Sequence, residues 1–348
     1  MSIDAQFRLA NAAQMAGDFP EAERRYHALA AAKPLWAYHN LGVLYVKTHR
    51  YDEAEAAFHK AVQADPTSPA PRHSLAMMLL GAGDYARGWP LMEARRELSS
   101  KNIPTVRLPY PEWRGEDLDG RRLFIVPEQG LGDQIQFARF VPELRARGVR
   151  VTYGCAPPLV RLLQPLGGDI LPIPGGQQAP QADYWSLIFS LPQHLNLTLA
   201  TIPGAPYLPL PSAQTAAGIG VVVRGSPTHT NDRFRSLPAD MAEQLLALGR
   251  SLAPEDTGAK DFQDTAEIIA GLSLVITVDT AVAHLAGAMG KPVWILLPSV
   301  ETDWRWLRSG AASPWYPSAR LYRQPAPDDW GPIVRQVIGD ARAFGATA

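Results

Sequence analysis

The chain has 348 residues, of which 46% are hydrophobic, and a formal net charge of −1. This length and apolar content predict two or three domains, and the near-neutral charge argues against nucleic acid or an anionic membrane as a partner. The single cysteine, Cys155, excludes an internal disulfide and a cysteine-rich zinc site. The first residues lack the pattern of a signal peptide and no run of about 18 apolar residues occurs, so we expect a cytoplasmic protein without a membrane span.

The first hundred residues are internally repeated. Residues 5–34 align without a gap on residues 37–66, with small residues at matching positions and a closing proline, and a third copy follows from about Ala70. This pattern is typical of tetratricopeptide repeats, so three repeats are predicted over residues 1–98. Because the first two copies are 32 residues apart and the next two are 34 apart, we expect a shortened first inter-repeat loop. Such repeats either bind a peptide or protein on their concave face or brace the adjoining domain, and the sequence leaves both open.

Residues 99–119 are rich in proline and polar residues and are predicted to form a linker. Strand and helix patterns alternate from there on, in two halves predicted as residues 120–213 and 214–348, with a final helix from about Trp330 to Phe344. After the expected helix 239–248, residues 250–253 alone are available for a middle strand. The second half is therefore predicted to be trimmed, with fewer strands or a very short one. The strands are expected to begin near Leu123, Val149, Ile170, Leu187, Ile219, Leu274, Val293 and Leu321.

A glycine-rich turn joins the first predicted strand, residues 121–127, to a helix at 134–141. Its glycines allow a tight turn and close approach of a ligand, and Asp133 falls near the N-cap or in the first helical turn. Asp133 is a candidate general base, and a plain helix cap is the alternative. The other candidate binding residues on this loop are Glu128, Gln129, Gly130, Gly132 and Gln134.

A second junction follows the predicted strand at 275–278. Thr280 and the backbone N–H groups of Ala281 and Val282 are placed to meet a phosphate oxygen, and Asp279 either to bind a sugar or ribose hydroxyl or to fix the loop. Two such junctions, each opening one α/β half, predict a cleft with a carboxylate at each lip.

These motifs resemble those of a known family. The run from Gly130 to Arg139, GLGDQIQFAR, is similar to the acceptor-side motif of heptosyltransferase-like glycosyltransferases (glycosyltransferase family 9-like) of the GT-B superfamily, and DTAVAHLA at 279–286 to their donor-side motif. DWRWL at 303–307 and SPWYP at 313–317 resemble the bacterial group that joins tetratricopeptide repeats to such a domain. The resemblance implies helical repeats followed by a GT-B fold of two Rossmann-like domains, the first for the acceptor and the second for a nucleotide sugar.

The resemblance also implies an activity. It is inverting, metal-independent transfer of a sugar from a nucleotide-diphosphate sugar to a protein or cell-surface glycan acceptor, without a further cofactor, with Asp133 as base and the repeats recruiting the acceptor or a partner. Arg235 matches the family residue that contacts the donor phosphates. His284 is part of the donor motif and would contact the donor, and a core histidine on a helix of small residues is the alternative.

The loop 225–236 carries two arginines that suit a diphosphate, and a solvated basic loop is the alternative. Arg224 and Asn231 complete the candidate donor-binding residues. Arg224 departs from the family pattern, and together with the trimmed second half it favours the alternative of a non-catalytic repeat scaffold with a degenerate glycosyltransferase-like domain.

Overall fold

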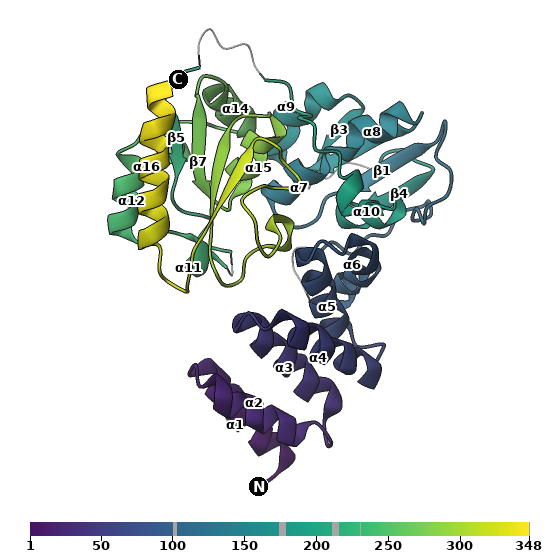
Figure 1. The fold of residues 1–348 in the computed structure, drawn as a ribbon. Helices are drawn as coiled ribbons and strands as arrows, with labels where there is room; N and C mark the ends of the chain where they lie inside the picture. The colour runs from purple at the N-terminus through teal and green to yellow at the C-terminus, as the bar shows by residue number, and fades with distance from the viewer. Residues whose placement is uncertain (100–102, 174–178, 211–215, 230, 348) are drawn as a thin grey trace. The chain divides into compact units, whose positions relative to one another are not determined.

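The computed structural model describes residues 1–99, 103–173, 179–210, 216–229 and 231–347. The chain forms two compact units, Met1–Ser100 and Lys101–Ala348, which are described separately (Figure 1). The predicted boundary at residues 213 and 214 lies outside the described residues, so the domain limits stay predictions. No helix in the described part of the chain is both long and apolar enough to cross a membrane.

The first unit consists of three helix pairs, as predicted for three tetratricopeptide repeats. Small residues allow the helices to pack closely: a Cβ on Gly42 would lie 2.5 Å from the ring of Phe58, so only glycine fits there. Ala10, Ala22 and Tyr26 are completely buried between the helices. The elements are α1 (Ile3–Met15), α2 (Phe19–Leu29), α3 (Pro34–Lys47), α4 (Tyr51–Ala64), α5 (Pro69–Gly81), α6 (Tyr85–Met92) and the 3-10 helix η1 (Glu93–Glu97).

The shorter spacing between the first two repeats does not come from a trimmed loop, and that prediction is wrong. The connections at 30–33 and 65–68 have four residues each, whereas α2 has 11 residues and α4 has 14. A helix can lose residues at its end without changing the turn that follows, whereas a four-residue helix connection has little length to give up. The deletion is therefore absorbed by the helix.

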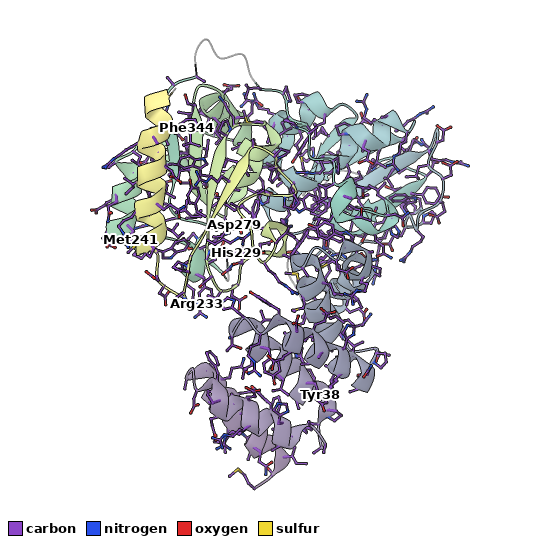
Figure 2. All side chains as sticks on the ribbon, in the orientation of Figure 1. Tyr38, His229, Arg233, Met241, Asp279 and Phe344 are labelled. Atoms are coloured by element: carbon purple, nitrogen blue, oxygen red, sulfur yellow. The ribbon has the colours of Figure 1, made fainter. Side chains whose placement is uncertain are left out.

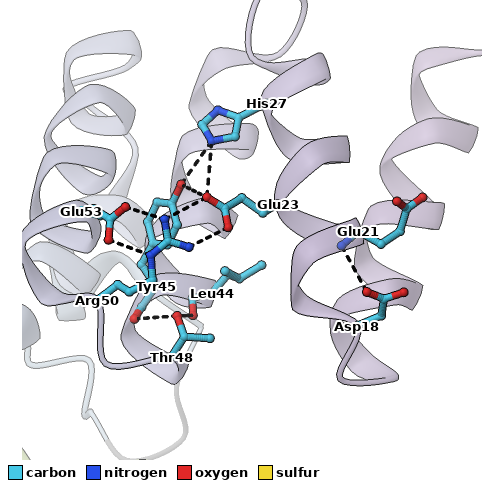
Figure 3. Close-up of polar contacts among 9 residues, drawn as sticks. All are labelled: Asp18, Glu21, Glu23, His27, Leu44, Tyr45, Thr48, Arg50 and Glu53. Atoms are coloured by element: carbon cyan, nitrogen blue, oxygen red, sulfur yellow. Dashed lines mark hydrogen bonds and ion pairs between the residues drawn. The ribbon is translucent and has the colours of Figure 1, made fainter.

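An ion-pair cluster links the first two repeats (Figure 3). Arg50, which precedes α4, donates to Glu23 of α2 (Nη1 to Oε2, 2.6 Å) and to Glu53 of α4 (Nε to Oε2, 2.7 Å). Its guanidinium carbon lies 4.3 Å from the ring centroid of Tyr45, whose hydroxyl donates to Glu23 at 2.8 Å. We call Glu23, Arg50 and Glu53 the repeat triad.

The second unit contains two parallel sheets with helices packed against them (Figure 1). The first has the order β3-β2-β1-β4 and the second β6-β5-β7-β8-β9. The strands are β1 (Arg122–Val126), β2 (Arg150–Cys155), β3 (Asp169–Pro172), β4 (Tyr184–Leu187), β5 (Ile219–Val222), β6 (Arg250–Ser251), β7 (Leu274–Val278), β8 (Val293–Leu297) and β9 (Ala319–Arg323). This succession of helical repeats and two parallel α/β sheets is the predicted GT-B-like architecture.

The helices of the second unit connect these strands. In the first half they are α7 (Leu131–Phe137), α8 (Phe140–Ala146), α9 (Val160–Leu163) and α10 (Leu191–His194), with short 3-10 turns η2 (Pro157–Leu159), η3 (Gln164–Leu166), η4 (Ile188–Ser190) and η5 (Leu199–Thr201). In the second half they are α11 (Asp232–Arg235), α12 (Ala239–Leu246), α13 (Pro254–Thr257), α14 (Phe262–Ala270), α15 (Ala281–Ala288), η6 (Trp304–Trp306) and α16 (Gly331–Thr347).

Strand burial explains why the strands were readable from the sequence. β7 and β8 are buried at every position, as expected for central strands of a parallel sheet covered on both faces. The trimmed middle of the second half is real, since β6 has two residues and pairs with β5. The strand expected to begin near Leu187 instead ends there, because polar residues before Tyr184 obscured its start.

The described part of the predicted linker, residues 103–119, packs against the first sheet instead of bridging freely. Trp113 N–H donates to the carbonyl of Trp185 at 2.7 Å, and Trp185 N–H donates to the carbonyl of Pro111 at 3.1 Å. These bonds cover the outer edge of β4, which would otherwise present unpaired backbone groups. The apolar side chains of Ile103 and Leu108 pack in the same region.

Candidate functional site

The starts of α7 and α15, one from each sheet, pack against each other (Figure 1). A Cβ on Gly132 would lie 2.7 Å from Cδ2 of His284 and 3.3 Å from Cα of Ala281, so a residue without a side chain is required at this contact. Both helices follow central strands, β1 and β7. The structure therefore brings the two predicted strand-to-helix junctions together at the carboxyl ends of the two sheets, where α/β proteins bind ligands.

Asp133 lies in the first turn of α7, which begins at Leu131, earlier than predicted. Its Oδ2 accepts a hydrogen bond from the Gly130 N–H at 2.8 Å, the contact of a helix cap. Its Oδ1 accepts from Nη2 of Arg305, and the side chain is 21% exposed. Burial raises the pKa of the Asp133 carboxyl, and the Arg305 charge opposes that rise. A carboxylate has about four lone-pair positions, so two remain for a further ligand.

Arg305 is a central residue of this junction. Its side chain is 5% exposed, and Nη1 donates to Oδ2 of Asp303 at 2.7 Å. Nε donates to the side chain of Gln136, so all three guanidinium nitrogens have acceptors. The guanidinium carbon lies 4.6 Å from the ring centroid of Trp304. We call Asp133, Arg305 and Asp303 the junction triad.

A second buried arginine connects the halves in the opposite direction. Arg139, immediately before α8, is 3% exposed, and Nη1 donates to the carbonyls of Pro203 and Trp315, both at 3.0 Å. Its guanidinium carbon lies 4.8 to 5.0 Å from the ring centroids of Tyr207, Trp315 and Tyr316. Each half thus inserts one arginine among aromatic side chains, and both arginines form hydrogen bonds across the junction of the halves.

Arg235 is packed beneath its loop. Nη1 donates to the backbone carbonyl of Asp279 at 2.8 Å, Nε lies 3.3 Å from Oδ1 of Asp232, and the side chain is 11% exposed. A Cβ on Gly225 would come within 2.6 Å of the guanidinium. The alternative of a solvated loop is therefore wrong for Arg235, because its guanidinium joins the two loops that follow β5 and β7.

Other candidates on this loop lie differently. Arg224 and Arg233 are exposed. Asn231 donates from Nδ2 to the carbonyl of Glu301 at 2.8 Å, and its N–H donates to Nδ1 of His229 at 3.2 Å. His229, labelled with Asp279 in Figure 2, faces the charges of Asp133 and Asp303.

The start of α15 carries the predicted donor-side groups. Thr280 is the N-cap residue, but its side chain contacts Thr277 (Oγ1 to Oγ1, 3.1 Å) and does not cap the helix. The N–H groups at a helix start have no acceptor within the helix, and Ala281 and Val282 occupy that turn. Asp279 precedes it, and burial, followed by the nearby Asp303 charge, raises the pKa of Asp279 to about 7.

His284 has the contacts of a core residue. It is 6% exposed, Nδ1 lies 2.9 Å from the Tyr316 hydroxyl, and the ring stacks on Trp306 at 5.4 Å. Burial lowers the pKa of His284 well below its usual value, so the ring is neutral. A donor contact of His284 stays a prediction.

The acceptor-side loop is fixed by two buried side chains. Glu128 is 2% exposed and Oε1 accepts from the Phe189 N–H at 3.0 Å. Gln134 is 6% exposed and Oε1 accepts from the Ala156 N–H at 2.8 Å. Gln129 has a φ of 63°, which turns the chain sharply before the exposed Gly130. These contacts hold the loop in shape and leave Asp133 as its partly exposed carboxylate.

Sequence reasoning assigned no role to Arg305, Asp303, Arg139 or His229. The DWRWL motif contained a signal, because an arginine between two tryptophans suits a buried, aromatic-flanked cation. Its partner Asp133 lies 172 residues away in the chain, which no local pattern can reveal. Within the described ranges, no group of three His, Cys, Asp or Glu side chains is arranged to hold a metal ion.

Comparison with known families supports the sequence-based assignment. Residues 35–68 match the tetratricopeptide repeat, and residues 203–298 match glycosyltransferase family 9 (heptosyltransferase). The predicted resemblance is confirmed: the chain carries a tetratricopeptide repeat and a glycosyltransferase family 9 domain. The second match includes Arg235 and the 279–284 motif, but neither Asp133 nor Arg305.

Individual proteins are also similar to this chain. Protein FlbA of Caulobacter vibrioides is 26% identical over 362 residues, which cover 85% of this chain and 59% of FlbA. A glycosyl transferase family 9 structure from Veillonella parvula has a TM-score of 0.45 at 12% identity, covering 68% of this chain and all of that one. A mutant O-GlcNAc transferase of Thermobaculum terrenum has a TM-score of 0.26 at 15% identity, covering 84% and 82%. Both structural likenesses are weak.

Proposed function

We propose that this chain is an inverting, metal-independent glycosyltransferase that moves a sugar from a nucleotide-diphosphate sugar to a protein acceptor, with a cell-surface glycan as the other acceptor class. The observation that carries the proposal is the meeting of α7 and α15, which places Asp133 of one half beside the donor-side motif of the other. A cytoplasmic location is part of the same proposal.

The proposed chemistry assigns one task to each half. Asp133 takes the proton of the acceptor hydroxyl as that oxygen attacks the anomeric carbon, and the bond from this carbon to the diphosphate oxygen breaks. The diphosphate leaves with the bonding electron pair. The N–H groups at the start of α15 and the nearby Arg235 are the groups that would stabilise its charge.

Donor binding is tested by a thermal-shift panel of nucleoside diphosphates and their sugars. A ligand present at 100 times its dissociation constant is expected to stabilise the fold by about 2.7 kcal/mol. Incubation with a labelled form of the best ligand and candidate polypeptides then measures transfer. A panel without any stabilising ligand would contradict the donor assignment.

The repeats are proposed to recruit a polypeptide acceptor or a partner. Trp36, in the repeat that matches the family model, is 46% exposed and is therefore accessible to an acceptor or partner. Trp36→Ala is expected to raise KM for the acceptor with donor hydrolysis unchanged. Unchanged KM would favour repeats that only brace the neighbouring unit.

A non-catalytic scaffold is the second candidate, and two contacts favour it. Both oxygens of Asp133 already accept hydrogen bonds, and Arg235 is engaged with Asp279 and Asp232. A scaffold of this kind would bind a nucleotide sugar without turning it over, or bind none. Donor binding without hydrolysis or transfer over long incubation would decide for this candidate.

A further inference from the structure

Arg305 has two carboxylate partners from different parts of the chain. Nη2 donates to Asp133 of α7, and Nη1 donates to Asp303, which lies two residues before Arg305. Asp303 also accepts from the backbone N–H of Arg305 at 2.9 Å, so its position is fixed by the same turn. The Arg305 side chain is 5% exposed, whereas Asp133 and Asp303 are 21% and 30% exposed.

This arrangement answers a difficulty in the proposed chemistry. When Asp133 accepts a proton, its negative charge disappears. A buried guanidinium left without a counter-ion is strongly unfavourable. A carboxylate that is the sole counter-ion of a buried guanidinium therefore resists protonation. Asp303 lies 2.7 Å from Nη1, a contact separate from that of Asp133, so Arg305 would keep this counter-ion when Asp133 is neutral.

We propose that Asp303 is a positioning residue that serves as the second counter-ion of Arg305, so that Asp133 can be neutralised during sugar transfer without leaving a buried cation unpaired. The inference depends on the proposed function for its catalytic meaning. The proton passes from the acceptor hydroxyl to Asp133, and Asp303 and Arg305 keep their protonation throughout.

Several charged groups around Asp133 affect its pKa, and a pH measurement must separate the effect of Asp303 from theirs. Arg305 and Asp303 face Asp133 from the η6 turn, and His229 faces it from the loop after β5. Tyr153 of β2 also interacts electrostatically with Asp133, and Asp279 with Arg305. Burial is the main cause of the raised pKa of Asp133, and the Asp303 charge adds to it. Removing that charge is therefore expected to lower the pKa of Asp133 and weaken the base.

A double-mutant cycle tests the counter-ion role without any assay of activity. Asp133→Asn and Asp303→Asn each keep an acceptor oxygen and leave Arg305 one carboxylate, so each is expected to change stability modestly. The double variant leaves the buried cation without a carboxylate in the junction triad. Its unfolding constant is expected to rise at least about 100-fold beyond the product of the single effects. Additive effects would overturn the proposal.

The catalytic part is tested by the pH profile of kcat. Asp303→Asn is expected to move the acidic limb down by roughly one pH unit and to lower kcat, because Asp133 then holds its charge more firmly. Glu301→Gln removes one exposed charge from the same loop without touching Arg305 and serves as the matched control. An unshifted profile in an active enzyme would overturn the inference. A parent chain without sugar transfer would instead contradict the proposed function, and the stability cycle would still decide the role of Asp303.

Discussion

The molecule contains two triads of the same composition, an arginine between two carboxylates, in different surroundings. In the repeat triad the side chains of Glu23, Arg50 and Glu53 are 23%, 37% and 51% exposed, whereas in the junction triad Arg305 is 5% exposed. Hydrogen bonding to Arg50 lowers the pKa of Glu23 and of Glu53. Burial raises the pKa of Asp133 although Arg305 is equally close.

The exposure of each triad to water thus decides whether a carboxyl pKa within it is lowered or raised. In the repeat triad the ion pairs are solvated surface contacts, which salt screens and which add little to the free energy of unfolding. At the junction the same groups lose their hydration, and a carboxylate there becomes a better proton acceptor. A structural clamp and a candidate catalytic site can therefore both be built from an arginine and two carboxylates, and burial distinguishes them.

The largest contrast is expected from removal of each arginine. Arg305→Met leaves two carboxylates in a poorly hydrated site and is expected to cost about 3 kcal/mol or more of unfolding free energy. Arg50→Met, the matched change in the repeat triad, is expected to have a small effect that vanishes at 1 M salt. Urea unfolding at low and high salt measures both. Equal losses would remove the distinction between the triads.

The next contrast concerns turnover. Asp133→Asn keeps the Gly130 contact and removes the proton acceptor, so turnover is expected to fall at least about a hundredfold with donor affinity nearly unchanged. Glu53→Gln in the repeat triad is the control and should leave kcat intact. If Asp133→Asn stays within about threefold of the parent, Asp133 is a helix cap. Glu128 would be a poor substitute base, because it is buried against the Phe189 N–H.

A third arginine sharpens the comparison, since Arg235 is buried but has one carboxylate and one carbonyl as partners. Arg235→Ala is expected to weaken binding of a nucleoside diphosphate about tenfold, because one charge-assisted contact is lost. Arg233→Ala, on the same loop but exposed, should change binding little. Calorimetry on both variants checks this, and equal affinities would retire the phosphate role of Arg235.

The smallest effect is a difference in pH dependence. A carboxyl whose folded pKa is about 7 stabilises the fold at low pH, and this contribution is lost as the pH rises toward and through 7. Asp279 is therefore expected to make the protein less stable at pH 7 than at pH 6 by about 1 kcal/mol, and Asp279→Asn should abolish that difference. The pKa of Glu23 is lowered, so Glu23 stabilises the fold at pH values above its unfolded pKa and loses this contribution only in acid. Glu23→Gln should therefore leave the stability difference between pH 6 and pH 7 unchanged. Denaturation at the two pH values decides the matter.

The fold was predictable because its signals are local. Buried strands such as β7 and β8 are short apolar runs, a glycine turn marks the start of α7, and Asp279 and Thr280 mark the start of α15. The position of Asp133 was also local, since it caps its own helix. The electrostatic partner of Asp133 could not be predicted from local sequence, because Arg305 belongs to the other half and contacts Asp133 only in the folded protein. Burial of Arg235 likewise follows from a contact with the Asp279 carbonyl, 44 residues away, which its own loop does not reveal.

The extended segment along β4 bears on where this chain can be cut. A shortened protein that starts at residue 120, the first position of the predicted α/β half, would lose Pro111 and Trp113 and leave the β4 edge open to strands of other molecules. Starting at residue 103 would keep the edge closed. The far edge of the second sheet has a similar cover, where Leu321 N–H of β9 donates to the carbonyl of Ala311 at 2.8 Å. If the protein that starts at residue 120 aggregates and the one that starts at residue 103 is soluble, protection of the sheet edge sets the N-terminal limit of this unit. The position of the first catalytic residue would then not set it.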